Sequence, residues 1–219
     1  MPFTKQIKNA VEQYANAHIA DYDWHKRFFS FIKDEALANR LAEEFIATRF
    51  IYKLLEGMEA DGWLLRAEVR NQILAYASIY EAVLHHLLFD LLPDEPRVIA
   101  LTEFKTFKRI SIPRPNQVQL EKYLSHDGKK IVPTVAAVAK NDVSKVRFDA
   151  KAQCAFELGF IDEGLRDDLL EFYQARNAIH IHAEIRKGIG YEIKLSQRAY
   201  RRMERLRKQV AAQLKILKL

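Results

Sequence analysis

The sequence predicts an all-α protein, namely a helical bundle that carries a small β-hairpin or extended insertion. Apolar residues recur every three or four positions over long stretches of the 219 residues, as they do on the buried face of a helix. Apart from Pro2, every proline lies between Pro93 and Pro133. Because proline interrupts helices, this distribution leaves long segments on both sides of the middle region in which helices can form.

The N-terminal quarter is expected to be helical. An amphipathic helix is predicted over about residues 4–20 and a short helix over residues 24–32. A third apolar stripe then stops at Gly57. Its members are Leu37, Leu41, Phe45, Thr48, Tyr52 and Leu55. Asp61 follows as a plausible N-cap of the next helix, since its carboxylate can accept a hydrogen bond from an unpaired N–H group of the first turn.

The longest uninterrupted apolar stripe covers residues 62–92. It is made of Leu65, Val69, Ile73, Tyr76, Tyr80, Val83, Leu87 and Leu91. At 1.5 Å rise per residue, a single helix over this range is about 45 Å long. We expect it to form the spine of the domain.

The proline-containing middle region is expected to be irregular. Residues 97–101 and 107–112 are predicted as either short strands or extended loops, and Pro113 and Pro115 end the second of them. Residues 117–124 are expected to form one or two helical turns.

Two helices with clear boundary signals follow the middle region. Asp149 is predicted to cap a helix that ends at Gly159, a residue type suited to the left-handed conformation just past a helix end. Asp162 is predicted to cap the next helix, which runs to about His180.

A β-hairpin is predicted between that helix and the last one. Apolar and polar residues alternate over residues 181–186 and 191–195, on both sides of a turn that contains Gly188 and Gly190. Ser196 is then expected to cap the final helix. The apolar face of this helix consists of Tyr200, Met203, Leu206, Val210, Leu214 and Leu217.

Positive charge is concentrated in the C-terminal helix. The chain carries a formal net charge of +6, and from residue 194 onward only Glu204 balances a series of cations. These are Lys194, Arg198, Arg201, Arg202, Arg205, Arg207, Lys208, Lys215 and Lys218. Such a stripe can attract polyanions, although the charge run alone favours an ordinary solvated helix face.

Several features that the sequence lacks indicate its cellular compartment and bear on whether it binds a cofactor. Cys154, the one cysteine, lies in an apolar run and is expected to be a buried thiol in a reducing compartment. No apolar run approaches the ~18 residues of a membrane span, and the N-terminus does not have the pattern of a signal peptide, so we expect a cytoplasmic protein. Neither a Gly-rich phosphate loop nor a nucleophile elbow occurs, and no cofactor is expected. Glu81 and His85, with the adjacent His86, have a spacing that can bind zinc, but the sequence offers no second pair of ligands. We therefore expect these residues to lie on a helix surface or in a dimer seam and not in a zinc site.

The segment Arg176–His182 is the most distinctive chemical feature. Arg176 continues an apolar stripe formed by Leu165, Leu169 and Phe172, and a buried guanidinium must reach an acid, an anion or a water-filled cleft. His180 follows Arg176 by four residues and is its neighbour on a helix. His182 can turn toward Arg176 only if the helix ends near His180.

Histidine and arginine suit phosphodiester chemistry. Imidazole, with a pKa of about 6.5, can act as acid or base near neutral pH. A guanidinium can bind a phosphate through two parallel hydrogen bonds. The simpler interpretation is that His180, His182 and Asn177 are ordinary polar residues at a helix end, where a protonated imidazole is mildly favoured.

Three features occur in order within residues 61–208: the long apolar helix, a helix that leads into Gly159-Phe160-Ile161, and a helix that ends in Arg176-Asn177, with His182 after four more residues. In this arrangement the chain resembles the HEPN superfamily of nucleotide- and RNA-associated helical domains. Residues 148–177 also resemble helical regulators similar to the mannitol operon repressor, a HEPN-like group in which nuclease activity is not the expected role.

The HEPN resemblance implies a metal-independent endoribonuclease, built as a homodimer in which the Arg-His motifs of both chains meet in one cleft. On this interpretation Arg176 stabilises the transition state, Asn177 orients the phosphate or an imidazole, and His182 has the family spacing for the acid or base. Helical geometry favours His180 for that role, so the two histidines remain alternatives. The implied partners are RNA or a nucleotide, a second copy of the chain and, in a toxin or defence system, an antitoxin.

Two other functions remain open. The protein is alternatively a non-catalytic helical regulator or dimerisation module, or it binds a nucleotide through the same arginine without cleaving RNA. For the domain organisation, we expect residues 1–60 to form an N-terminal helical extension and residues 61–219 to form the HEPN-like domain.

Overall fold

The computed structural model describes residues 2–124, 127–129 and 131–219. The chain forms two compact units. One contains the residues up to Leu92 together with those from Arg147 onward, and the other contains Pro93–Val146. Residues before and after position 61 belong to the same unit. The mostly helical fold class is confirmed, with a single two-stranded antiparallel sheet in the described part of the chain.

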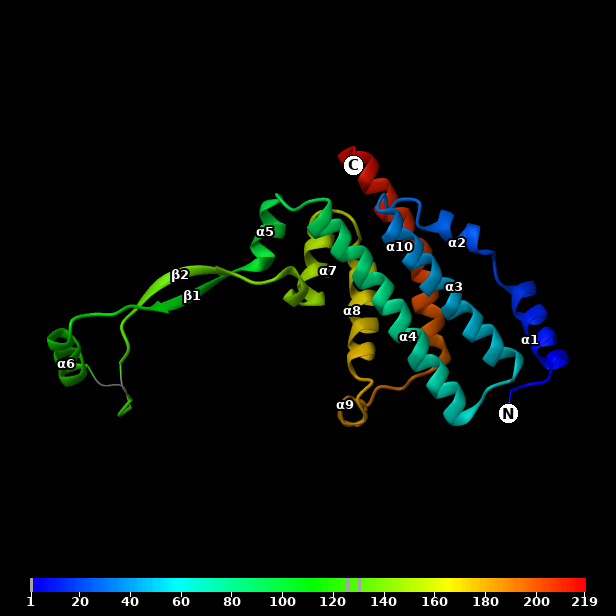
Figure 1. The fold of residues 1–219 in the computed structure, drawn as a ribbon, viewed down its shortest axis with the longest axis horizontal. Helices are drawn as coiled ribbons and strands as arrows, with labels where there is room; N and C mark the ends of the chain where they lie inside the picture. Colours follow the sequence, from blue (N-terminus) through cyan, green and yellow to red (C-terminus); the bar gives the residue numbers. More distant parts are fainter. Residues whose placement is uncertain (1, 125–126, 130) are drawn as a thin grey trace. The chain divides into compact units, whose positions relative to one another are not determined.

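The first unit consists of helices (Figure 1). They are α1 (Lys5–His18), α2 (Tyr22–Phe28), α3 (Glu35–Gly57), α4 (Gly62–His85), the π-helical turn η1 (His86–Asp90), α7 (Phe148–Glu157), α8 (Glu163–Asn177), α9 (Ile181–Lys187) and α10 (Ile193–Leu217). The helix α4 contacts α3, α7, α8 and α10, and α3 contacts α1 and α2. The spine predicted from the long apolar stripe is therefore the centre of this unit.

The apolar stripe of α4 is buried as expected. Val69, Ile73 and Val83 are inaccessible to solvent, and the hydroxyl of fully buried Tyr80 donates a hydrogen bond to the carbonyl of Ala199 in α10 (2.6 Å). The prediction of one regular helix to residue 92 is wrong in detail. After His85 the backbone makes the wider turn η1, in which the N–H group of Leu91 donates to the carbonyl of His86.

Two of the predicted boundary residues are confirmed. The carboxylate of Asp162 accepts a hydrogen bond from the backbone N–H of Leu165 (2.8 Å) and caps α8. Gly159 follows α7 with φ +79°, and a Cβ atom there would lie 3.1 Å from the amide nitrogen of Gln213. A larger residue would therefore be strained by its backbone conformation and by this close approach.

Three other predicted caps are wrong or incomplete. Asp61 occupies the N-cap position of α4 but its side chain makes no capping hydrogen bond. The N-cap of α7 is Arg147, and Asp149 instead forms an ion pair with it (2.7 Å). Ser196 lies inside α10, where its hydroxyl donates to the carbonyl of Ile193 (3.0 Å) because the helix begins earlier than predicted.

The second unit contains the only described strands. Its elements are α5 (Pro96–Thr102), β1 (Glu103–Arg109), α6 (Arg114–Tyr123), β2 (Thr134–Lys140) and the 3₁₀ turn η2 (Val143–Lys145). The strands pair antiparallel, with Glu103 opposite Lys140 and Arg109 opposite Thr134. Of the two segments predicted as strand or loop, residues 97–101 are helical because Pro96 starts a helix at its first turn, whereas residues 107–112 lie partly in β1.

The hairpin predicted over residues 181–195 is wrong. Residues 181–187 form α9, in which Ile181 and Ile185 are 67% and 74% exposed. The alternating pattern was misleading because it does not show whether a partner strand exists, and a helix satisfies its backbone hydrogen bonds without a neighbouring strand. Within the described ranges, no helix is both long enough and apolar enough to cross a membrane.

Candidate functional site

Arg176 lies in the last turn of α8 and is half-buried. Its guanidinium carbon is 5.1 Å from the centre of the Tyr173 ring, and Nη1 donates to the Tyr173 hydroxyl (3.3 Å) and to Oδ1 of Asn177 (3.1 Å). Among the described residues, no carboxylate forms an ion pair with it. Arg176 is thus held in place by neutral groups, and its charge is not compensated locally.

The buried stripe of α8 differs from the predicted one at its C-terminal end. It runs from Phe172 to Ala175 and Ala178, and Arg176 lies beside it. The hydroxyl of Tyr191 donates to the backbone carbonyl of Ala175 (2.9 Å). The stripe therefore ends in small residues, and Arg176 is directed to the margin of the core.

His180 and His182 lie beyond the end of α8. The helix ends at Asn177, and His180 occupies the N-cap position of α9 with an extended backbone (φ −71°, ψ 123°). His182 follows in the first turn of α9, and both side chains are exposed. Within the described ranges, no hydrogen bond connects either imidazole to Arg176. The structure therefore brings Arg176 and Asn177 together and leaves both histidines at the surface.

The position of this segment is set by two arginines of α4 that the sequence did not single out. Arg70 Nη2 donates to the carbonyl of Ile179 (2.5 Å), two residues beyond the end of α8. Glu184 of α9 is 7% exposed and pairs with Arg66 (2.5 Å) and Arg70 (3.8 Å). A signal for this contact was present in the sequence, since Arg66 and Arg70 lie four residues apart on one helix face.

Tyr173 connects Arg176 to the core. Its ring stacks on that of Phe148 in α7, with centroids 4.2 Å apart and 15° between the planes. Burial and the nearby carboxylate of Glu81 raise the pKa of Tyr173, so its hydroxyl remains protonated near neutral pH. Glu81 is itself paired with the buried ammonium of Lys151 (3.3 Å). The aromatic support under Arg176 is therefore fixed on α7 and α4.

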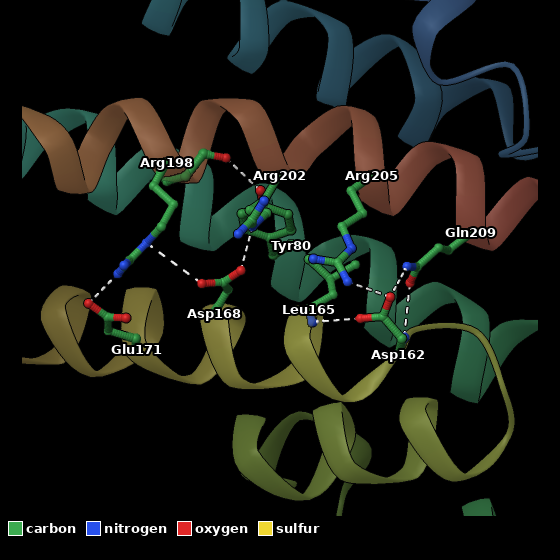
Figure 2. A network of polar contacts seen from close by, with 10 residues as sticks. Tyr80, Asp162, Leu165, Asp168, Glu171, Arg198, Arg202, Arg205 and Gln209 are labelled. Atoms are coloured by element: carbon green, nitrogen blue, oxygen red, sulfur yellow. Dashed lines mark hydrogen bonds and ion pairs between the residues drawn. The ribbon is translucent and has the colours of Figure 1, made fainter.

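A contrasting arrangement occurs between α8 and α10. In Figure 2, Arg198, Arg202 and Arg205 of α10 reach across to carboxylates of α8. The partners are Asp168 and Glu171 for Arg198, Asp168 for Arg202, and Asp162 for Arg205. Further along α10, Glu204 pairs with Arg207 and Lys208. Much of the predicted basic stripe is therefore compensated, and the α8–α10 seam offers little charge to a polyanion.

The other histidines do not form a metal site with their neighbours. Nδ1 of His86 lies 2.8 Å from a carboxylate oxygen of Asp90 across the turn η1. Burial and the nearby Lys151 lower the pKa of His85. In the part of the chain that the structure describes, no three His, Cys, Asp or Glu side chains are grouped so that they could bind a metal ion. Cys154 is buried, as predicted.

Comparison of the chain with family models, with curated proteins and with solved structures gives no match. The chemistry of the candidate site therefore has to be argued from its own groups. These are a fixed guanidinium without a carboxylate, the adjacent amide of Asn177, and two exposed imidazoles within six residues of Arg176. Such a set can bind a phosphate and can exchange protons near neutral pH.

Proposed function

We propose that this protein binds RNA and cleaves it as a metal-independent endoribonuclease of the HEPN type, at a site formed by Arg176, Asn177, His180 and His182. The observation that supports the proposal most is the environment of Arg176. Its guanidinium is fixed against Tyr173 but has no carboxylate partner among the described residues. A phosphate is the ligand that such a group binds best, because two of its N–H groups match two phosphate oxygens.

The proposed reaction needs one base, one acid and one cation. The base removes the proton of a ribose 2′-hydroxyl, and the 2′ oxygen forms a bond to the adjacent phosphorus. The bond from phosphorus to the 5′ oxygen breaks, and the acid protonates that oxygen, which gives a 2′,3′-cyclic phosphate and a 5′-hydroxyl. Arg176 stabilises the additional negative charge of the transition state, and imidazole has the right pKa range for both proton transfers.

A homodimer would complete the site. Neither His180 nor His182 is hydrogen-bonded to Arg176 within one chain, whereas a two-fold interface presents each group twice. We therefore propose that the histidines of one chain act on a phosphate held by Arg176 of the other chain. The central prediction of this model is that activity requires the dimer.

The test is RNA cleavage in the presence of EDTA by the wild type and by Arg176→Ala, His180→Ala and His182→Ala. Arg176→Ala is expected to reduce the cleavage rate by about 100-fold or more, as loss of a group that stabilises transition-state charge does in other enzymes. The histidine that serves as acid or base should show a loss of similar size.

Arg166 provides a matched control for Arg176. It lies on the same helix and its guanidinium carbon is 4.8 Å from the centre of the Phe156 ring, but it pairs with Glu163 and Asp167. Arg166→Ala should therefore leave cleavage within about threefold of the wild type, since its charge is already compensated. Cleavage that persists in all three site variants would refute the assignment.

A non-catalytic function is the second candidate. It is favoured by the exposure of His180 and His182, which have no hydrogen-bonded partner to orient them in the described part of the chain. A regulator of this kind would bind RNA or a nucleotide through Arg176 without product formation. Binding that depends on Arg176, together with no cleavage by the wild-type dimer, would establish this alternative.

A further inference from the structure

Arg49 of α3 is another arginine that forms no ion pair with a carboxylate in the described ranges. It lines a hollow of about 190 Å³, which we call the Arg49 hollow. The lining residues are Arg49, Tyr52, Lys53, Gln72, Gln197, Tyr200 and Arg201. None of them belongs to the segment Arg176–His182. A water molecule occupies roughly 30 Å³ in the liquid, so this hollow is large enough for a small polyatomic ion.

The guanidinium of Arg49 is held by two tyrosine rings. Its carbon is 4.1 Å from the centre of the Tyr200 ring and 4.7 Å from that of Tyr52. Contacts with ring faces fix a guanidinium without using up its N–H groups, which lie in its plane. Arg49 is thus kept in position with donors left for a ligand.

Three cations, Arg49, Lys53 and Arg201, line the hollow. Lys53 forms an ion pair with Glu56, which also accepts a hydrogen bond from the Tyr52 hydroxyl (2.8 Å). Neither Arg49 nor Arg201 forms an ion pair with a carboxylate in the described ranges. This distinguishes Arg201 from the arginines that follow it in α10, whose charges are compensated by α8 and by Glu204.

Two buried groups, Glu68 and Tyr76, lie next to residues that line the hollow. Glu68 is 2% exposed, accepts a hydrogen bond from Gln72 (2.8 Å), and has its pKa raised by burial and by the nearby Glu56. The hydroxyl of buried Tyr76 makes no hydrogen bond of good geometry in the described part of the chain, but the guanidinium of Arg49 lies near enough to oppose the rise of its pKa. Burial raises the pKa of Tyr76 to about 12, so this hydroxyl is protonated at neutral pH.

We propose that the Arg49 hollow binds the terminal phosphate of a phosphate monoester, or free inorganic phosphate, through the guanidinium groups of Arg49 and Arg201. A phosphate monoester carries close to two negative charges at neutral pH and matches two guanidiniums better than a carboxylate does. The amide groups of Gln72 and Gln197 supply further hydrogen-bonding capacity. This site is separate from the proposed RNA cleavage site and does not depend on it.

The probes are inorganic phosphate, adenosine monophosphate, and the dinucleoside monophosphate ApA, whose one phosphate is an internal diester. Binding is measured with the full-length Arg176→Ala protein, so that the proposed RNA site does not contribute, by calorimetry and by thermal shift at constant ionic strength. Phosphate and adenosine monophosphate should bind and raise the melting temperature, whereas ApA should bind at least tenfold more weakly. Equal binding of ApA, or no binding of phosphate, would overturn the proposal.

Arg201→Ala and Lys208→Ala form the matched pair of variants. Both residues are exposed cations of α10, but only Arg201 lines the hollow. Arg201→Ala should weaken phosphate binding about tenfold, as expected for loss of a charge-assisted hydrogen bond, and Lys208→Ala by less than about twofold. Equal losses would reveal a non-specific charge effect and overturn the assignment.

Two further variants separate this site from the proposed catalytic one. Arg49→Lys keeps the charge but loses the planar fork, and should weaken phosphate binding about tenfold even where Arg49→Ala does not fold. Arg176→Ala removes any phosphate bound at the proposed RNA site, and the binding that remains should be that of the Arg49 hollow. If Arg176→Ala abolishes it, the phosphate binds at the Arg176 site and the Arg49 hollow is not a phosphate site.

Discussion

Arginines at the two ends of α8 have opposite surroundings. Over its first three turns, carboxylates of this helix pair with arginines of α8 itself and of α10 (Figure 2). At its last turn, Arg176 rests on Tyr173 and has no carboxylate partner in the described ranges. The number of positive charges in a segment therefore does not locate an anion site. What locates it is a guanidinium that is held in place but not compensated.

The largest expected difference between the two ends concerns stability. The carboxylate of Asp168 is 15% exposed and pairs with both Arg198 and Arg202. Asp168→Ala should therefore lower the free energy of unfolding by about 2–3 kcal/mol, because it leaves partly buried arginines without a partner. Urea denaturation measures this loss. Arg176→Ala should change the same quantity by less than about 1 kcal/mol, and equal losses would contradict the contrast.

A smaller effect is expected where α9 is attached to α4. Glu184→Gln keeps the shape of the side chain but removes the charge that Arg66 and Arg70 share. We expect a loss of about 1–2 kcal/mol in the free energy of unfolding, since hydrogen bonds to charged groups contribute about that much. In the variant, amide hydrogen exchange should accelerate more over residues 178–190 than over α4. Unchanged exchange there would show that these ion pairs do not hold the segment.

The pH dependence of the seam gives a still smaller effect. Burial alone would raise the pKa of Asp162, but hydrogen bonds from Leu165, Arg205 and Gln209 together lower it. An acid with a lowered pKa stabilises the fold above its unfolded pKa, and this contribution is lost as the pH falls through the folded pKa. Its size should stay below about 1 kcal/mol, because the side chain is 45% exposed and water screens its charge.

Thermal melts of Asp162→Asn and the wild type from pH 7 to pH 3 test this expectation. Below about pH 4, the melting temperature of the wild type should fall more than that of the variant, since the variant has no carboxylate at position 162 to protonate. Parallel curves for the two proteins would show that Asp162 does not contribute through its charge.

The helical part of the fold was predictable because it depends on local patterns. The apolar stripe of α4 and the cap at Asp162 depend on residues that are close in sequence. The hairpin was misplaced because strands β1 and β2 are separated by α6, and alternation in one segment does not reveal its distant partner. Alternation over residues 181–186 suggested a strand, but Glu184 is buried against Arg66 and Arg70 of α4. The spacing of these two arginines indicates a shared helix face but does not identify the acid that pairs with it.

The candidate site was predictable only in part. Arg176 stood out because a guanidinium follows an apolar stripe, yet the end of α8 at Asn177 separates it from His180 and His182. The stacking of Tyr173 on Phe148 and the attachment of the segment by Arg70 depend on helices that are distant in sequence. In the same way, the pairing of Arg198, Arg202 and Arg205 could not be read from α10 alone, because the acids lie on α8.

The most direct measurement is the salt dependence of binding to an uncleavable 2′-O-methyl RNA strand. Affinity is followed by fluorescence anisotropy from about 50 to 200 mM salt for the wild type, Arg176→Ala and Arg166→Ala. If Arg176 contacts a phosphate, Arg176→Ala should bind more weakly and lose about 0.7 from the slope of log K against log salt concentration. Arg166→Ala should match the wild type. Wild-type affinity and slope in Arg176→Ala would contradict the central claim that this uncompensated arginine binds RNA.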